Sequence, residues 1–229
     1  MSNYVVYHLH TELSLLDSCT NFKLYVDKAK ELGQHAICFT EHGNCYNWIE
    51  KKEYCNSNGI KYIHGVEIYL TKELLQVDDD NSNPHKVRDN YHTILIAKNY
   101  EGVKEINSLI DKSTQESHFY YKNRISFDEF KNISDNVIKI SACLASPLNK
   151  LRDESLISYY DYLEIQPHVN SEDQKEYNKW LHEMSIKHDK PLIAGTDTHS
   201  LNKYKSECRS ILQKAKHIDI YPCPLRYAR

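Results

Sequence analysis

Short apolar runs alternate with amphipathic segments along most of the chain. Uninterrupted apolar runs of this length are typical of strands that are buried on both faces. We expect strands at seven places: 4–10, 36–40, 60–70, 92–97, 137–141, 160–166 and 192–196. The first predicted strand carries His8 and His10 at alternate positions, so both side chains should point to the same face.

The segments between these runs have the spacing of amphipathic helices. In residues 21–32 most of an apolar face comes from Phe22, Leu24, Tyr25, Ala29 and Leu32. Thr20 or Asn21 can cap this helix, and Gly33 can end it. Further helices are expected over 45–58, 101–112, 172–188 and 204–216. This alternation of strands and helices predicts an α/β fold, with a mostly parallel sheet or a barrel.

Metal-capable residues follow several predicted strands at their carboxyl ends. They are His10, His42, Cys143, Asp197 and His199. In α/β barrels the active site is built at that rim from residues of several strands. The shared placement is therefore a stronger indication of a site than any one of these residues alone.

His92 is the exception, because it begins its apolar run instead of ending it. A parallel strand would place it at the opposite rim. We expect the strand that contains Glu67 to turn through the polar segment 76–90 and return antiparallel, which would bring His92 to the common rim. The acidic residues of that segment, 78–80, are interpreted as a solvated loop and not as a cation site.

Length, charge and composition limit the classes of protein to which this chain can belong. A length of 229 residues suits a single domain spanning 1–229, and a net charge of −3 does not indicate a polyanionic partner. The seven cysteines include no Cys-x-x-Cys pair, which fits a reducing cytoplasm. No apolar run approaches the ~20 residues needed to cross a bilayer and the first residues lack the pattern of a signal peptide, so we expect no membrane association.

Nine residues are candidates for metal ligands: His8, His10, Asp17, His42, Glu67, His92, Cys143, Asp197 and His199. Imidazoles mixed with carboxylates suit zinc, manganese or iron, and a single thiolate favours zinc among them. The alternative is independent use, in which aspartates cap helices, histidines lie at the surface and the cysteine packs in the core.

The sequence resembles the polymerase and histidinol phosphatase (PHP) domains, and among them the N-terminal domain of bacterial DNA polymerase III alpha subunits. The similarity covers nearly the whole chain. It rests on the segments 8–12 (HLHTE), 14–17 (SLLD), 40–44 (TEHGN), 59–67 (GIKYIHGVE), 92–99 (HTILIAKN), 119–122 (FYYK), 141–144 (SACL) and 197–199 (DTH). The resemblance implies a distorted barrel of seven strands and seven helices, a (β/α)7 TIM-like fold with three divalent metals at its rim.

The resemblance also implies how the nine residues are shared between the three ions, which would be zinc, manganese or iron. The first would take His8, His10, Glu67 and Asp197; the second would share Glu67 and add His92 and Cys143; the third would take Asp17, His42 and His199. The chain departs from the family pattern at Glu41, where an aspartate usually precedes His42. That position is not normally a ligand, so the change affects the surroundings of the ligands.

Clustered metals at such a rim favour phosphoester hydrolysis by a metal-activated water. Asp197, His199 and His168 are the candidate catalytic residues, and protonation of the leaving group could come from His199, from His168 or from a metal-bound water. Arg88, His168, Lys122 and Arg124 are the candidate substrate-binding residues. The segment 119–124 interleaves aromatic and basic residues, as single-strand binding surfaces do, although a packed turn would have the same composition.

Three functions are compatible with these residues. The first is a metal-dependent phosphoesterase acting as a 3′–5′ exonuclease on DNA, with single-stranded DNA or a nucleotide phosphate as substrate. The second is a phosphomonoesterase of small molecules, similar to histidinol phosphatase or a nucleotide phosphatase. The third is a non-catalytic module that docks on a separate DNA polymerase subunit.

Overall fold

The computed structural model describes residues 4–75, 85–167 and 171–215. Its strands are β1 (Ala36–Phe39), β2 (Lys61–Thr71), β3 (Tyr91–Ala97), β4 (Arg124–Ser126), β5 (Val137–Ile140), β6 (Leu163–Ile165) and β7 (Leu192–Ala194). Its helices are α1 (Phe22–Glu31), α2 (Trp48–Ser57), α3 (Tyr100–Ser113), α4 (Phe127–Lys131), α5 (Pro147–Leu151), the 3-10 helix η1 (Glu154–Tyr159), α6 (Glu172–His188) and α7 (Lys203–Ala215).

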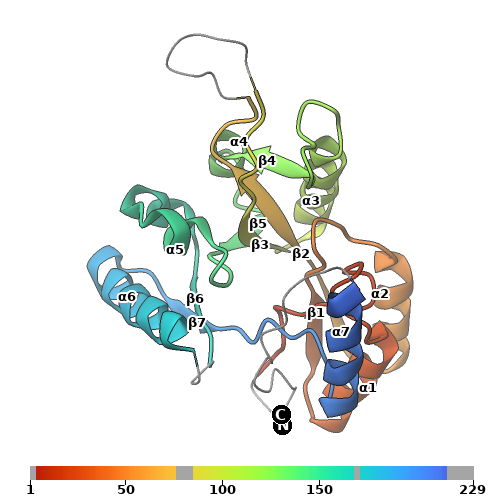
Figure 1. Cartoon of the computed structure of the whole chain (residues 1–229). Helices are drawn as coiled ribbons and strands as arrows, with labels where there is room; N and C mark the ends of the chain where they lie inside the picture. Colours follow the sequence, from red (N-terminus) through yellow and green to blue (C-terminus); the bar gives the residue numbers. More distant parts are fainter. Residues whose placement is uncertain (1–3, 76–84, 168–170, 216–229) are drawn as a thin grey trace, which may run out of the picture.

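The long strand β2 organises the larger sheet, whose order is β1-β2-β3-β5. β2 pairs in parallel with β1 along its first residues and with β4 along its last, and β3 pairs with its other edge (Figure 1). β2 and β3 are antiparallel, with Tyr69 opposite His92. The expected return strand is thereby confirmed, and it brings His92 to the edge of the sheet where the other candidate ligands lie.

A closed seven-stranded barrel is not found among the described residues. β6 and β7 form a separate parallel pair, and single bridges such as Ile140 with Tyr162 connect the two sheets. The prediction of a strand over 4–10 is wrong: only Leu9 forms a bridge, with Thr198. The cause is local, because the Leu9 N–H donates to the side chain Oγ1 of Thr40 (2.9 Å) and not to a backbone carbonyl, which interrupts the ladder.

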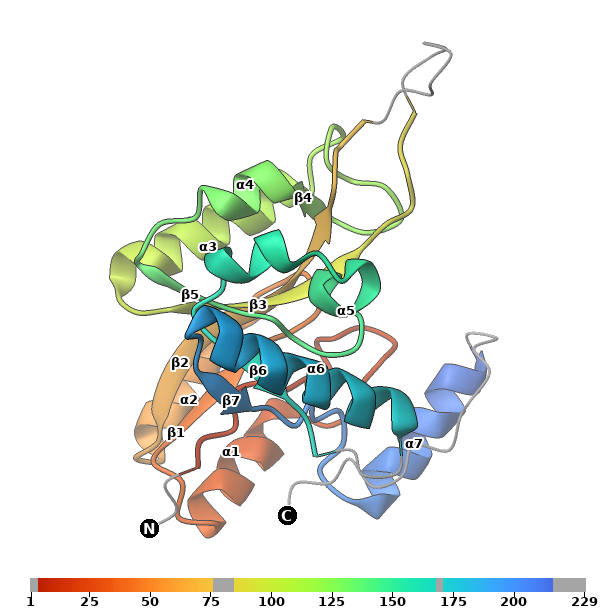
Figure 2. The same ribbon diagram turned by 90° about the vertical axis from the view of Figure 1, so that its left-hand side faces the viewer.

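The helices cover the outside of the two sheets. Asn21 caps α1 by accepting a hydrogen bond from the Lys23 N–H, and α1 packs near α2 beside β1 (Figure 1). α6 lies along β6 and β7 (Figure 2) and buries Tyr177, Leu181 and Met184 in the largest hydrophobic cluster. Within the described part of the chain, no helix is both long and apolar enough to span a membrane.

Four elements were not expected from the sequence: β4, α4, α5 and η1. Each is only three to six residues long, too short to show a helical or strand period. The three helices among them, α4, α5 and η1, start at side-chain caps. Ser126 and Glu129 form a capping box at α4, and Ser146 caps α5 with Pro147 at its first position.

The packing of α6 gives a test of this architecture. Leu181→Ala removes a fully buried side chain and should lower the free energy of unfolding by about 2–5 kcal/mol, because a cavity remains in the core. Ile186→Ala, on the same helix but 72% exposed, should change it by less than about 0.5 kcal/mol. Urea unfolding followed by circular dichroism measures both, and equal effects would contradict the orientation of α6.

Candidate metal centre

The structure brings all nine candidate ligands together at one end of the sheets. Three groups of donor atoms each lie within 4.8 Å of one another: His8, His10 and Asp197; His10, His42 and His199; and His42, Glu67 and His92. Cys143 joins them, with its Sγ 3.8 Å from His92 Nδ1 and 4.0 Å from Glu67 Oε1. The groups share members, so the arrangement is one continuous cluster with three places where donors converge.

Glu67 lies at the middle of this cluster. Its Oε1 is 2.7 Å from His92 Nδ1 and 3.6 Å from His8 Nε2, and its Oε2 is 2.6 Å from His42 Nδ1 and 3.5 Å from His10 Nε2. Burial raises the pKa of the Glu67 carboxyl, but His92 and His42 outweigh burial and hold the pKa well below its ordinary value. A buried carboxylate is therefore shared by four imidazoles.

Backbone pairing explains why His42 meets Glu67. The chain continues beyond β1 and still pairs with β2: the Glu67 N–H donates to Glu41 O (3.1 Å) and the Gly43 N–H to Glu67 O (2.8 Å). Gly43 has a φ of +65°, and an added Cβ would lie 2.5 Å from Asn123 Oδ1. A glycine is thus required where the chain turns away from the site.

Glu164 on β6 sets the direction of His8. Its carboxylate oxygens lie 2.8 and 3.0 Å from His8 Nδ1, and they also accept hydrogen bonds from the Tyr7 hydroxyl and Gln166 Nε2. Because a carboxylate accepts, Nδ1 carries a hydrogen, and Nε2 faces Glu67 and Asp197 (3.3 Å). Burial disfavours the charged ring, but Glu164 and Asp197 raise the pKa of His8 well above its ordinary value.

Ser14 sets the direction of His10 in the same way. His10 Nδ1 lies 3.0 Å from Ser14 Oγ, which donates its own hydrogen to Glu41 Oε2 (2.6 Å). His10 Nδ1 is therefore the donor, and its Nε2 lone pair faces Asp197 and Glu67. Burial, together with the neighbouring His42 and His199, lowers the pKa of His10 to about 3, so this ring is neutral at physiological pH.

Glu41, the residue that departs from the family pattern, is not among the converging donors. It is fully buried, and it accepts hydrogen bonds from Thr11, Ser14 and the Lys51 ammonium (2.7 Å). Burial raises the pKa of its carboxyl, but Lys51 outweighs burial and the net shift is downward. The longer side chain thus serves the orientation of His10 through Ser14.

Asp17 and His199 form the outer part of the cluster. Asp17 Oδ2 lies 2.9 Å from both His199 Nε2 and His42 Nε2, and the Asp17 Oδ1 accepts from Arg209 Nη2 at 2.8 Å. His199 Nδ1 must carry a hydrogen because it faces the carbonyl of Asp197 (2.9 Å), which can only accept. Its Nε2 therefore faces the Asp17 carboxylate, at a distance where a proton or a divalent cation can lie between the two.

The donors fit divalent metal ions. Among the buried side-chain atoms that make no hydrogen bond with a described residue, four belong to this cluster: His8 Nε2, His10 Nε2, His42 Nδ1 and Glu67 Oε2. The last two lie 2.6 Å apart but lack the angles of a hydrogen bond. Burying such atoms without a partner is costly, and a cation at the convergence points would satisfy all four. Imidazole, carboxylate and a nearby thiol are the ligands of zinc, manganese and iron.

The candidate substrate-binding residues do not form one site in the structure. Lys122 lines a groove that also contains His92, and its Nζ lies 5.0 Å from the Tyr69 ring centroid. Arg88 stacks on the Tyr121 ring at 3.9 Å. Arg124 is fully buried, with its guanidinium on the carbonyls of Val87 and Asp89, so its charge holds the fold together and does not face the groove. His168 lies outside the described residues.

Glu164 and Arg209 contribute to the site and were not predicted from the sequence. Glu164 was identifiable as a charged residue inside an apolar, buried strand, which is an unusual combination. Arg209 gave no signal, because it lies on α7, a helix without a buried residue, and only the fold brings it to Asp17.

Comparison with known proteins agrees with this geometry. The profile of the PHP domain family matches residues 7–192. The DNA polymerase III alpha subunit of Aquifex aeolicus is 31% identical over 226 residues, and that of Helicobacter pylori strain 26695 is 32% identical over 216 residues. These matches cover 92% and 84% of this chain but 19% and 17% of the relatives, so the chain spans about a fifth of their length.

Solved structures share the fold at low sequence identity. A Bifidobacterium adolescentis protein assigned to the metal-dependent phosphoesterases is 15% identical, with a TM-score of 0.57 over 86% of this chain and 87% of that chain. An amidohydrolase from Chromobacterium violaceum has 11% identity and a TM-score of 0.53 over 85% and 87%. Endonuclease Q, bound to a duplex substrate with an abasic lesion, has 14% identity and a TM-score of 0.50 over 88% and 49%.

The orientation of His8 by Glu164 can be tested directly. Glu164→Gln removes the charge that holds His8 Nδ1–H and should weaken divalent metal binding about 10- to 100-fold. Glu183→Gln, an exposed residue of α6, should leave metal binding unchanged. Competition with a fluorescent zinc chelator measures both affinities; equal affinities for the two variants would show that His8 does not depend on Glu164.

Arg209 gives a second test at the outer part of the cluster. Arg209→Ala frees Asp17 from two hydrogen bonds, 2.6 Å to its carbonyl and 2.8 Å to Oδ1, so metal binding should weaken about tenfold through misplacement of Asp17. Lys214→Ala, exposed on the same helix, is the matched control. The same chelator competition applies, and an unchanged affinity in Arg209→Ala would exclude a role for α7 in placing Asp17.

Proposed function

The chain belongs to the PHP domain family, and from this membership and the geometry of the site we propose that it is a metal-dependent phosphoesterase acting as a 3′–5′ exonuclease on DNA. One observation carries the proposal. His8 Nε2 and His10 Nε2 are buried, lack a hydrogen-bond partner among the described residues, and are aimed at Asp197 and Glu67 by partners on their other ring nitrogens. Histidines that bind metal ions are typically oriented in this way, by a hydrogen bond on the other ring nitrogen.

We propose three divalent ions, held by the three overlapping groups of donors together with Asp17 and Cys143, which lie beside them. His8, His10, Glu67 and Asp197 would hold the first; Glu67, His92 and Cys143 the second; Asp17, His42 and His199 the third. When bound, divalent ions activate a water for attack on phosphorus and neutralise charge on the phosphate oxygens. Burial raises the pKa of the Cys143 thiol well above its ordinary value, so thiolate ligation there depends on a cation.

The chain's own residues supply the remaining requirements of phosphoester hydrolysis. A cleft of about 340 Å³ opens over the cluster, and Lys150 and Arg209 line it together with the ligands. Their positive charges can attract and orient a phosphate group. Asp197 and His199 remain the proposed catalytic residues. Since His199 Nδ1 is occupied by a carbonyl, only its Nε2 can bind an ion or carry a proton to the leaving oxygen, and these two roles compete.

DNA is the proposed substrate for two reasons. The relatives that match most of this chain are DNA polymerase III alpha subunits, and a structural neighbour, Endonuclease Q, was solved with a 27-mer duplex substrate. In addition, the cleft continues into a larger groove with an exposed aromatic wall and a lysine. A separate DNA polymerase subunit in the cytoplasm is the partner that this proposal implies.

The deciding experiment compares two substrates with one metal-loaded protein. Metal analysis comes first, followed by incubation with Mn²⁺ or Zn²⁺ and either 5′-labelled single-stranded DNA or p-nitrophenyl phosphate. Stepwise shortening of the DNA supports the exonuclease. Turnover of the monoester alone would indicate a small-molecule phosphatase. If the metal-loaded protein hydrolyses neither substrate, the result would favour a non-catalytic module.

The variants Asp197→Asn and His10→Ala should abolish hydrolysis while the protein stays folded. Each removes a donor from the convergence point of His8, His10 and Asp197. Asp128→Asn and His182→Ala, both at exposed positions, are the matched controls and should keep full activity. Initial rates at saturating Mn²⁺, with circular dichroism as a check of folding, measure the effect; full activity in either site variant would refute the assignment.

A further inference from the structure

A groove of about 630 Å³ opens directly beside the metal centre. Asp17, His42 and His92 line both this groove and the cleft over the cluster, so the two spaces are continuous. The groove walls come from distant parts of the chain and include Leu15, Tyr46, Tyr69, Phe119 and Lys122. A molecule that places a phosphate at the metal centre would therefore extend into this groove.

Large apolar side chains are exposed at the groove. Leu15 is 66% exposed, Tyr46 55% and Phe119 49%. Exposed apolar groups of this size, gathered at a cleft, mark a binding surface for a partly apolar ligand. A hydrogen bond connects two walls of the groove, because the Asn123 side chain of one wall donates to Gly43 O of the other at 2.7 Å.

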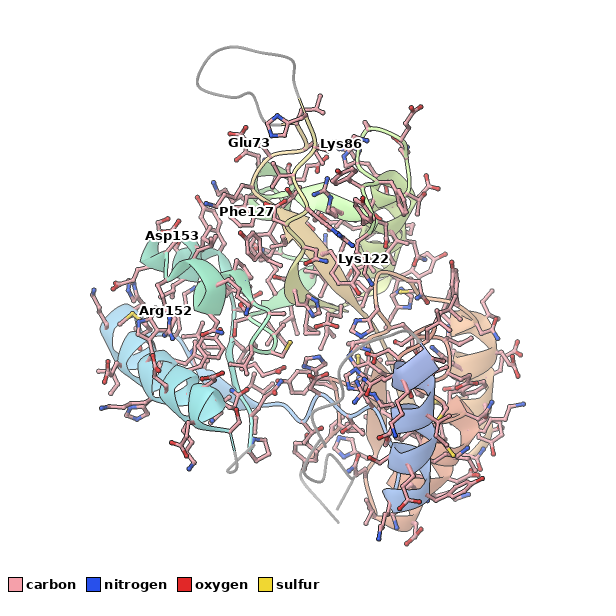
Figure 3. All side chains as sticks on the ribbon, viewed as in Figure 1. Glu73, Lys86, Lys122, Phe127, Arg152 and Asp153 are labelled. Atoms are coloured by element: carbon pink, nitrogen blue, oxygen red, sulfur yellow. The ribbon has the colours of Figure 1, made fainter. Side chains whose placement is uncertain are left out.

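The end of the groove near the metal centre is aromatic and positively charged. The Tyr69 ring stacks on His42 at 6.1 Å and meets the edge of His92 at 5.0 Å. Lys122, labelled in Figure 3, places its Nζ 5.0 Å from the Tyr69 ring centroid and 3.5 Å from its hydroxyl. A flat ring with a phosphate attached fits this order of apolar wall, aromatic floor and cation.

We propose that this groove binds the unpaired base of the nucleotide whose phosphate lies at the metal centre, with Phe119 and Tyr46 contacting the base and Lys122 a backbone phosphate. This inference rests on the phosphoesterase function proposed above and names its substrate class, a nucleic-acid strand with an unpaired end. Base–aromatic stacking is tolerant of sequence, so the groove selects for a single-stranded end and not for a particular base. A phosphate ester without a base would gain no binding affinity from the groove.

Binding measured without metal separates this inference from catalysis. Fluorescence anisotropy in EDTA would compare an oligo-dT that ends in a normal 3′ nucleotide with one that ends in an abasic 3′ nucleotide. The wild-type protein should prefer the normal end about tenfold, the order expected for one stacked base. Phe119→Ala should lose this preference, and Phe119→Trp, which keeps a stacking surface, should retain it.

Tyr100→Ala is the matched control. Tyr100 is an aromatic residue that is 68% exposed, and it lines a different groove, with Trp48 and His64. This variant should keep the wild-type preference for a normal end. Equal binding of normal and abasic ends by the wild-type protein, or an undiminished preference in Phe119→Ala, would overturn the inference. Neither result depends on hydrolysis, so a protein that binds with preference but does not cleave would refute the phosphoesterase function alone.

Discussion

The buried carboxylate of Glu67 is the group on which the rest of the site depends. It lies on the central strand β2 within reach of His8, His10, His42 and His92. A carboxylate removed from water is costly unless charge and hydrogen bonds compensate it. The fold provides that compensation by bringing three separate chain segments, the N-terminal residues, the end of β1 and the start of β3, to the same end of β2.

A second layer of polar residues surrounds the candidate ligands and forms hydrogen bonds with them. Glu164 holds His8, Ser14 holds His10, and Arg209 holds Asp17. Each partner takes one ring nitrogen or carboxylate oxygen and leaves the other facing inward. The polar layer therefore does for the metal centre what tight packing does for an apolar core: it selects one orientation for every donor.

Much of the candidate site could be predicted from the sequence, because ligand residues at strand ends follow a simple rule of α/β folds. His42, Cys143 and Asp197 were found in this way, and the antiparallel return of β3 was inferred from the position of His92 alone. The distorted seven-stranded barrel stays a prediction, because in the described part of the chain residues 8–10 are held by the Thr40 side chain and by backbone hydrogen bonds to Thr198, which no periodicity reveals. Arg209 and the burial of Arg124 depend on contacts between distant segments, and local patterns carry no information about those.

The central claim is that the buried donors at the end of β2 form a metal centre, and an anomalous-diffraction map of crystals soaked with Mn²⁺ or Zn²⁺ tests it most directly. The account predicts peaks about 2.0–2.3 Å from the inward-facing atoms of the cluster, His8 Nε2, His10 Nε2 and Glu67 Oε2 among them. A well-ordered site without a peak within coordination distance of any of these atoms would contradict it.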